Sequence, residues 1–116
     1  MLYVLHNKNF LNYILTNKLS PSRLDCVATV DTTDLEEAFR LTNHIDSDWQ
    51  GNPKVNAIAG IHRSTSVGDV IVDGTPGGLS SKHYIVESLG FRLLTPEEIT
   101  MMTFTLPDLL PRSKQP

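Results

Sequence analysis

Two short runs of β-branched and aromatic residues, 70–72 and 84–86, place the strongest constraint on the fold of this 116-residue chain. The segment between them begins with the turn dipeptide Asp73-Gly74 and is rich in glycine, serine and proline. This pattern predicts a β-hairpin with a long, flexible tip, because glycine and proline favour turns between extended runs. A further apolar run at 91–94 predicts a third neighbouring strand. The second half of the chain is therefore expected to be rich in β-structure.

The first half of the chain combines short strand patterns with a helical pattern. Residues 2–6 and 26–30 are apolar and predict two strands. Apolar residues within 10–19 recur at helical spacing until the Ser-Pro-Ser sequence at 20–22 stops the pattern, which predicts a weaker helix. Residues 54–58 alternate weakly and predict either a short strand or an irregular segment.

The clearest helix start in the sequence is at Thr33. Thr33 precedes Glu36 by three positions, a spacing at which each side chain bonds the backbone N–H of the other residue in a capping box. Acidic residues fill the first turn, where they favour the positive end of the helix dipole. An apolar stripe at helical spacing follows. The pattern predicts a well-capped helix from about Asp34 to His44.

A similar helix start follows at Thr95. Pro96 occupies the first helical position and Glu98 the third, an order typical of helix N-termini. The predicted helix is short and ends near Met102 or Phe104.

We expect one globular domain at 1–104 and a partly disordered tail at 105–116, which contains three prolines. The stretch 101–110 is nevertheless apolar enough to dock on a surface. That surface belongs to its own domain, to a second copy of the chain or to a partner protein, and the sequence leaves these alternatives open.

Composition supports a single domain, since 40% of the residues are hydrophobic and 20% are charged. A chain of this size buries roughly two-thirds of its unfolded surface, enough for a core without disulfides. We predict an α+β fold with a small, strongly bent antiparallel sheet or partly open barrel of about five strands. The well-capped helix packs on this sheet, and the weaker helix is near the N-terminus.

Several classes of protein are disfavoured by the sequence. No apolar run approaches the roughly 18–20 residues that cross a bilayer, and the first residues lack the pattern of a secretory signal. The single cysteine, Cys26, has no partner for an internal disulfide. We therefore expect a cytoplasmic protein with no membrane partner. The net charge of −3 and the scattered cations do not favour duplex nucleic acid as a partner.

The densest polar cluster covers residues 63–69, called here the polar corner; it contains an arginine, three hydroxyl side chains, a glycine and an aspartate. One interpretation is a ligand-binding turn in which Arg63 grips a phosphate or carboxylate and the hydroxyls donate hydrogen bonds. The other is a structural turn, in which the hydroxyls satisfy local backbone groups and Gly68-Asp69 forms a tight corner before a core strand. Phosphate-binding fingerprints such as the Walker A motif and G-x-G-x-x-G are absent.

Signatures of metal binding and catalysis are weak in this sequence. His44, Asp46 and Asp48 form the compact histidine–carboxylate cluster, but H-x-x-x-H and C-x-x-C spacings are absent. No G-x-S-x-G elbow or Cys–His signature supports a nucleophile. We predict no catalytic residue, no metal site and no cofactor. Cys26 is interpreted as a small buried hydrophobe.

The sequence Arg-Ser-Thr-Ser-Val-Gly-Asp-Val-Ile at 63–71, followed by Tyr-Ile-Val at 84–86 and Gly90-Phe91, resembles the pattern of YodL-like proteins. The upstream helix with Ala-Phe-Arg-Leu-Thr-Asn at 38–43 and then Trp49 is similar to the usual lead-in of that family. The likeness covers roughly residues 27–94. It implies a bacterial, phage or mobile-element origin and a role in acting on host factors, in the host cytoplasm if the protein is phage-encoded. It implies no established catalytic residue.

A second likeness concerns architecture alone. A Gly-Asp step before a strand, a returning strand and Gly-Phe before another strand are similar to small open barrels of the PUA-like and SH3-like kinds. Such barrels often bind RNA or peptides, although a fold does not fix a function.

Two hypotheses for function follow. The first is a non-catalytic interaction protein that binds and modulates a host protein, with Trp49 either an exposed binding anchor or a cover for one end of the core. The second is a module that binds RNA or a small phosphorylated ligand, with the corner side chains on phosphate. The candidate binding residues are Arg63, Ser64, Thr65, Ser66, Gly68, Asp69, Trp49, Asn43 and His44.

Overall fold

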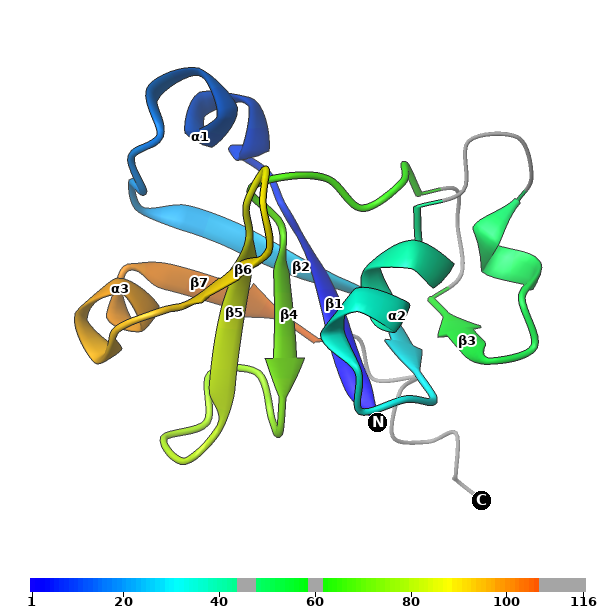
Figure 1. Ribbon diagram of the computed structural model, residues 1–116. Helices are drawn as coiled ribbons and strands as arrows, with labels where there is room; N and C mark the ends of the chain where they lie inside the picture. The colour runs from blue at the N-terminus through cyan, green and yellow to red at the C-terminus, as the bar shows by residue number, and fades with distance from the viewer. Residues whose placement is uncertain (44–47, 59–61, 107–116) are drawn as a thin grey trace.

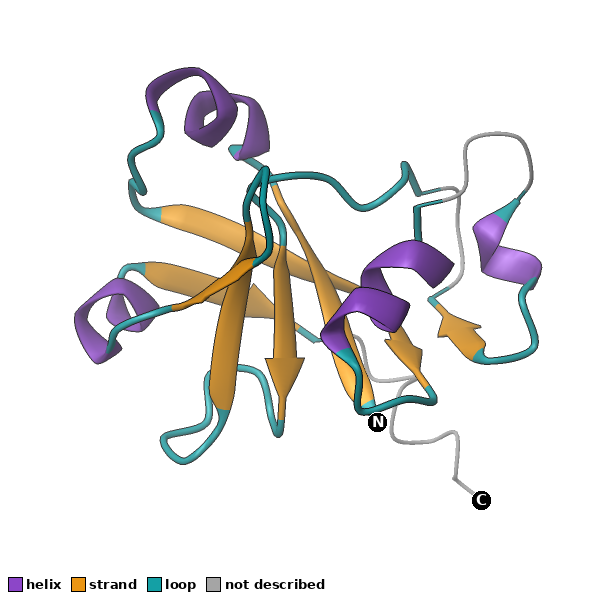
Figure 2. Cartoon of the chain, viewed as in Figure 1, coloured by secondary structure: helices purple, strands orange, loops and turns teal. Residues whose placement is uncertain are grey.

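A single sheet organises the molecule, with helices packed against both of its faces (Figures 1 and 2). The computed structural model describes residues 1–43, 48–58 and 62–106. In chain order the elements are β1 (Leu2–Asn7), α1 (Phe10–Thr16), β2 (Ser22–Val30), α2 (Leu35–Leu41), the 3-10 helix η1 (Trp49–Gly51), β3 (Val55–Ala57), β4 (Val70–Asp73), β5 (Lys82–Val86), β6 (Phe91–Leu93), α3 (Pro96–Thr100) and β7 (Met102–Thr105).

The described part of the chain forms a seven-stranded sheet in the order β3-β2-β1-β4-β5-β6, with β7 beside β2. Neighbouring strands are antiparallel except for the parallel pair of β2 and β7. The strand β2 pairs with β1 along one edge and with two short strands along the other. On that second edge, β7 pairs with the first part of β2 and β3 with its last part. In Figure 1, β2 and β7 cross the direction of β4 and β5 steeply, but the sheet does not close into a barrel.

The α+β class and the hairpin of β4 and β5 are confirmed. The strand number is larger than the predicted five, because β3 forms and because β7 adds a strand after α3. The prediction of a helix end and a tail for residues 102–105 is wrong, because Met102 and Phe104 alternate with threonines at the spacing of a strand. Thr105 ends β7, and residues 107–116 lie outside the described residues.

The two faces of the sheet bury different apolar clusters, because side chains alternate along each strand. On β1, Val4 packs into the cluster beneath α2 and η1, whereas Leu5 packs into the cluster beneath α1 and α3. On β4, Val70, Ile71 and Val72 are all fully buried, as expected for a strand in the centre of a sheet.

The helix predicted over 34–44 forms as α2, with a different start and an earlier end. Its N-cap is Asp34, whose side chain accepts from the backbone N–H of Glu36, so the capping box expected at Thr33 is wrong. Thr42 follows the last helical residue, Leu41, and its hydroxyl donates to the carbonyl of Ala38 at 2.8 Å. His44, predicted to end this helix, lies outside the described residues.

The helix start predicted at Thr95 is confirmed. The Thr95 hydroxyl accepts from the Glu98 N–H at 3.1 Å, and the Glu98 carboxylate accepts from the Thr95 N–H at 2.9 Å. The helix α3 ends at Thr100, before the predicted end at Met102 or Phe104, because the chain turns into β7. Within the described residues, no helix is both long enough and apolar enough to cross a bilayer.

Candidate functional site

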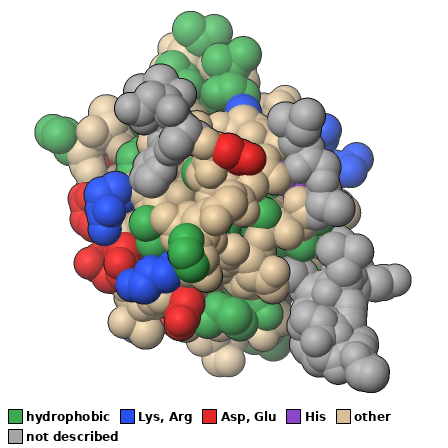
Figure 3. Space-filling model, turned by 90° about the vertical axis from the view of Figure 1, so that its right-hand side faces the viewer, with side chains coloured by type: hydrophobic (Ala, Val, Ile, Leu, Met, Phe, Trp, Pro, Cys, Tyr) green, Lys and Arg blue, Asp and Glu red, His purple; other side chains and the backbone are tan. Residues whose placement is uncertain are grey.

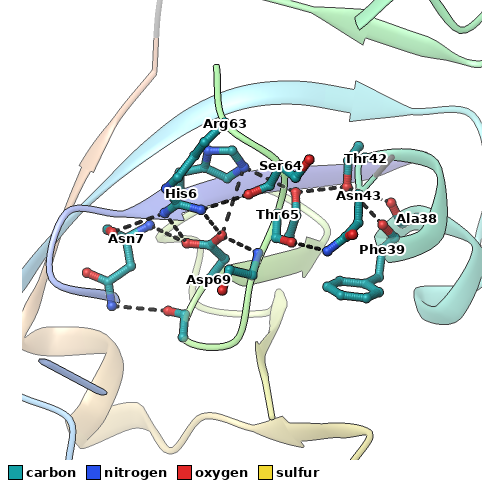
Figure 4. Close-up of polar contacts among 12 residues, drawn as sticks. His6, Asn7, Ala38, Phe39, Thr42, Asn43, Arg63, Ser64, Thr65 and Asp69 are labelled. Carbon is teal, nitrogen blue, oxygen red and sulfur yellow. Dashed lines mark hydrogen bonds and ion pairs between the residues drawn. The ribbon is translucent and has the colours of Figure 1, made fainter. Parts of the chain in front are cut away.

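The polar corner lies where the chain enters β4, next to the end of β1 (Figure 4). Its centre is Asp69, whose side chain is 0% exposed. Oxygen Oδ1 accepts from the backbone N–H of Asn7 at 2.8 Å, and Oδ2 accepts from the backbone N–H of Ser66 at 2.7 Å. Each oxygen also accepts from Arg63, at 2.8 Å and 2.7 Å respectively. The carboxylate is therefore fully enclosed by protein donors.

Arg63 uses its guanidinium to connect three segments of the chain. Besides Asp69, Nη1 donates to the Ser64 carbonyl at 3.0 Å and Nη2 to the Asn7 carbonyl at 3.3 Å. The guanidinium group lies over the Phe10 ring, with its central carbon 3.8 Å from the ring centroid. Such a cation–π contact is favourable, and here it attaches the corner to the first residue of α1.

Gly68 has a positive φ of 95°, in keeping with the tight corner predicted at Gly68-Asp69. A Cβ added at Gly68 would lie 3.2 Å from the Cα and the carbonyl oxygen of Phe10, closer than ordinary packing allows. The Gly68 carbonyl accepts from the Asn7 side-chain amide at 3.1 Å. Glycine thus lets the corner and the start of α1 approach each other.

A chain of hydroxyl groups runs from β1 to α2 through the corner. The Thr42 hydroxyl donates to the Ala38 carbonyl, and the Thr65 hydroxyl donates to Thr42 Oγ1 at 2.8 Å. Thr65 Oγ1 is then free to accept from His6 Nε2, which is 3.1 Å away. Since a carbonyl can only accept, this order of donors places the His6 proton on Nε2.

The His6 ring is held neutral. Burial, followed by the positive charge of Arg63 and the neighbouring His62, lowers the pKa of His6 to about 3, although Asp25 opposes the shift. Burial also raises the pKa of Asp69, against the opposing influence of Arg63 and the two backbone N–H groups. The corner thus combines a neutral buried histidine with an ion pair whose carboxylate is buried and whose guanidinium is partly exposed.

Most of the predicted site residues do come together. Thr65, Ser66, Gly68 and Asp69 form the corner with Arg63, and the Ser64 carbonyl takes part. The Asn43 side-chain amide donates to the Thr65 carbonyl and ties α2 to the corner. His44 lies outside the described residues.

Trp49 is 3% exposed and belongs to the apolar cluster beneath α2. Its ring neighbours those of His6 and His62, with centroid distances of 6.3 Å and 6.5 Å. Of the two interpretations of Trp49, the structure therefore shows the core-covering one, and its side chain is not an exposed anchor.

His6, Asn7 and Phe10 complete the corner but were missed in the sequence. The available signal was the polar pair His6-Asn7 at the end of an apolar strand, followed by the helix start. Sequence spacing hides the rest, because Asn7 and Asp69 are 62 positions apart.

The corner has little capacity left for an anionic ligand. Asp69 and Thr65 are buried, and both terminal nitrogens of Arg63 already donate to carboxylate and carbonyl oxygens. The adjoining hollow of about 420 Å³ contains Lys8, but Asp25 lies 3.7 Å from its ammonium group. Both cations near the corner are thus paired with carboxylates.

The described residues hold neither a metal-binding cluster nor a reactive thiol. Among the residues that the structure describes, no group of three or more histidine, cysteine, aspartate and glutamate side chains could hold a metal ion. Cys26 is buried in β2, and burial raises the pKa of its thiol to about 11. A thiol with that pKa is a weak source of thiolate at neutral pH, as expected for a buried hydrophobe.

A different surface stands out on α1, which the corner holds in place. Leu11, Ile14 and Leu15 are 60%, 45% and 82% exposed, and their spacing places them on neighbouring positions of one helix side. Figure 3 shows hydrophobic side chains gathered at the top of the molecule, where α1 lies in Figure 1. We call these three residues the α1 face.

The inner side of α1 is firmly attached. Tyr13 is 4% exposed, and its hydroxyl donates to the Glu87 carboxylate at 2.8 Å. Glu87 in turn accepts from Arg92 at 3.1 Å. The helix ends at Thr16, and the next residue, Asn17, takes the left-handed conformation and donates its N–H to the Tyr13 carbonyl. The α1 face is thus presented on a helix fixed from below.

Comparison of the chain with models of protein families, with curated proteins and with solved structures finds no match.

Proposed function

We propose that this chain is a non-catalytic protein-binding module of bacterial, phage or mobile-element origin, and that it engages a host protein through the α1 face. The observation that carries the proposal is the exposure of Leu11, Ile14 and Leu15 side by side on one short helix. Contiguous exposed apolar side chains are a common mark of protein–protein contact surfaces.

The anchoring of α1 supports this role. Arg63 lies over Phe10, Gly68 packs closely against it, and Tyr13 is bonded to Glu87. A surface held rigid before binding loses less conformational entropy when a partner arrives. In this proposal the polar corner makes no contact with the partner, and its role is to position the helix that does.

The charges around the α1 face indicate the chemistry of the partner. Lys18 is exposed just after the helix, whereas Lys8 before it is exposed but pairs with Asp25, and residues 7–24 contain no acidic side chain. The helix adds the amide of Asn12, and its two flanking residues add those of Asn9 and Asn17. This combination suits an apolar groove with an acidic rim, since complementary charge fixes orientation and speeds encounter.

The alternative, an RNA or phosphate-binding module, receives less support. It requires Arg63 and the hydroxyls of the corner to face the ligand, whereas Arg63 is paired with Asp69 and Thr65 is buried. Phosphate recognition also predicts binding that weakens steeply with ionic strength. A thermal-shift screen with nucleotides and short RNAs at low and high salt separates the two functions, because a specific ligand raises the melting temperature.

The direct test compares capture of proteins from bacterial lysate by the wild type, Leu15→Ser and Leu79→Ser. Leu79 is a matched control because it is also fully exposed but lies far from α1 along β5. It belongs to the loop before β5, whereas the turn beside α1 follows β5. We expect the partner to be captured by the wild type and Leu79→Ser and lost with Leu15→Ser. Capture that survives Leu15→Ser and Leu11→Ser contradicts the proposal.

The affinity for the captured partner is then measured with Lys18→Glu. Reversal of this charge should weaken binding if the partner has an acidic rim, and the effect should shrink as salt screens the charges. Stronger binding by Lys18→Glu would contradict the assigned partner chemistry.

A further inference from the structure

An apolar pocket lies away from the α1 face, between the loop that joins β4 to β5 and the end of the chain at α3 and β7. Its volume is about 480 Å³, within the usual range for sites that bind small molecules. The walls that matter here are Leu79 from the loop, Leu93 from β6, Ile99 from α3, and Met102 and Phe104 from β7. These residues come from four separate parts of the fold.

The loop that borders the pocket is attached to β5 and β7 through His83 and Phe104. The backbone N–H of Gly77 donates to His83 Nε2 at 2.8 Å, and the His83 ring meets the Phe104 ring edge to face at a centroid distance of 5.5 Å. Gly77 has φ 79°, and a Cβ there would lie 3.3 Å from the Phe104 ring. The loop is therefore built to lie against β7, and the pocket is preformed.

Two leucines at the rim of the pocket leave much of their side chains exposed. Leu79 is 106% exposed and Leu93 is 52% exposed, although both line the pocket. An apolar molecule placed between them would bury this surface, which is favourable because apolar area is removed from water.

One charged residue lines the pocket, Lys82 at the start of β5. Its side chain is exposed, and no ion pair to it is found within the described residues, although Asp73 faces it in the strand register. The chemistry of the pocket is thus an apolar interior with a single ammonium group at its edge.

We propose that this pocket binds a small amphipathic carboxylate, with its hydrocarbon body between Leu79, Leu93 and Phe104 and its carboxylate near Lys82. The proposal is independent of the protein-binding role of α1. It assigns the chain a second, small-molecule site whose ligand combines an apolar chain with one negative charge.

Three probes of equal chain length test it: decanoate, decanol and decyltrimethylammonium, each below its micelle concentration. Isothermal calorimetry gives the affinities, and methyl NMR shifts locate the site. We expect decanoate to bind most tightly and to shift the methyl signals of Leu79, Leu93, Ile99 and Met102. Equal binding of all three probes, or shifts confined to the α1 face, would overturn the proposal.

Variants at exposed positions test the contacts without threatening the fold. Leu79→Ser should weaken decanoate binding about tenfold, the effect of losing roughly half the burial energy of a leucine. Lys82→Ala should weaken decanoate about threefold, as expected for an exposed charge pair, and leave decanol unchanged. Leu89→Ser and Lys18→Ala are matched exposed controls outside the pocket. Decanoate binding that is unchanged by both pocket variants rules out this site.

Discussion

The guanidinium of Arg63 and the carboxylate of Asp69 meet in a two-pronged ion pair, with N–O distances of 2.7 Å and 2.8 Å. The same guanidinium covers the ring of Phe10, the first residue of α1. One side chain therefore connects the entry of β4 to the helix that carries the exposed apolar face. This connection explains how a largely buried polar cluster can serve recognition without contacting a partner.

Substitution of Asp69 should strongly destabilise the fold. Asp69→Asn leaves Arg63 without its anion and replaces one carboxylate oxygen by an NH2 donor, so that only one of the two backbone N–H groups keeps its acceptor. Removal of one partner from a buried ion pair typically costs about 3–5 kcal/mol, and we expect the lower end because Arg63 is partly exposed. Urea unfolding measures the loss. Asp25→Asn is the control, since Asp25 pairs with exposed Lys8 and Arg23 and should cost less than about 1 kcal/mol. Similar losses in both variants would contradict the central position of Asp69.

Gly68→Ala should displace the start of α1. The positive φ and the contact at 3.2 Å with Phe10 both oppose a side chain at Gly68, so the free energy of unfolding should fall by more than about 1 kcal/mol. Gly51→Ala is the matched control, because a Cβ there meets nothing within 4 Å. Chemical unfolding of both variants, with NMR shifts of α1 residues, checks the prediction. It fails if Gly68→Ala is as stable as Gly51→Ala.

His6 should make the protein less stable in mild acid. Its pKa is about 3 in the folded state, below the ordinary value of 6.5, so the unfolded chain binds the proton first as pH falls. The stability contributed by neutral His6 is present above about pH 6.5 and declines toward pH 3, by up to about 1.4 kcal/mol per pH unit.

Urea unfolding of the wild type and His6→Gln between pH 7 and pH 4 isolates this effect, since glutamine keeps an N–H donor for Thr65. The difference in stability between the two proteins should shift in favour of His6→Gln as the pH falls. Nitrogen NMR should show the His6 proton on Nε2 throughout this range. Parallel pH profiles of the two proteins would be inconsistent with a neutral buried His6.

Trp49→Ala should act on stability. The ring is 3% exposed and packs in the core cluster beneath α2, and truncation of a buried aromatic side chain costs about 3–5 kcal/mol. Thermal and urea unfolding should both show the loss, whereas Leu15→Ser should change stability by less than about 0.5 kcal/mol as an exposed substitution. A Trp49→Ala variant with the stability of the wild type would restore the anchor interpretation.

The sequence correctly predicted the elements that depend on interactions between residues close together along the chain. The Thr95–Glu98 capping box and the β4–β5 hairpin depend on neighbouring residues, and both form as predicted. The start of α2 was misplaced because three successive polar residues, Thr32, Thr33 and Asp34, can all cap a helix, and tertiary contacts decide which one does.

The features missed in the sequence depend on contacts between distant segments. The short strand β7 forms because β2 offers it an open edge, and four residues carry too little periodicity to show this. The polar corner was recognised as a cluster, but its partners Asn7 and Phe10 are far away along the chain. The burial of Trp49 likewise depends on β1 and α2, although its neighbours in sequence are polar.

Site-specific photo-crosslinking tests the central claim, that the chain binds its partner through α1 while the corner only supports it. A photoreactive amino acid is placed at Leu15, at Leu79 or at Ser64, and each protein is irradiated in the lysate used for capture. We predict a partner adduct from position 15 and none from positions 79 and 64. An adduct from Ser64 in the polar corner, with none from Leu15, would contradict the claim.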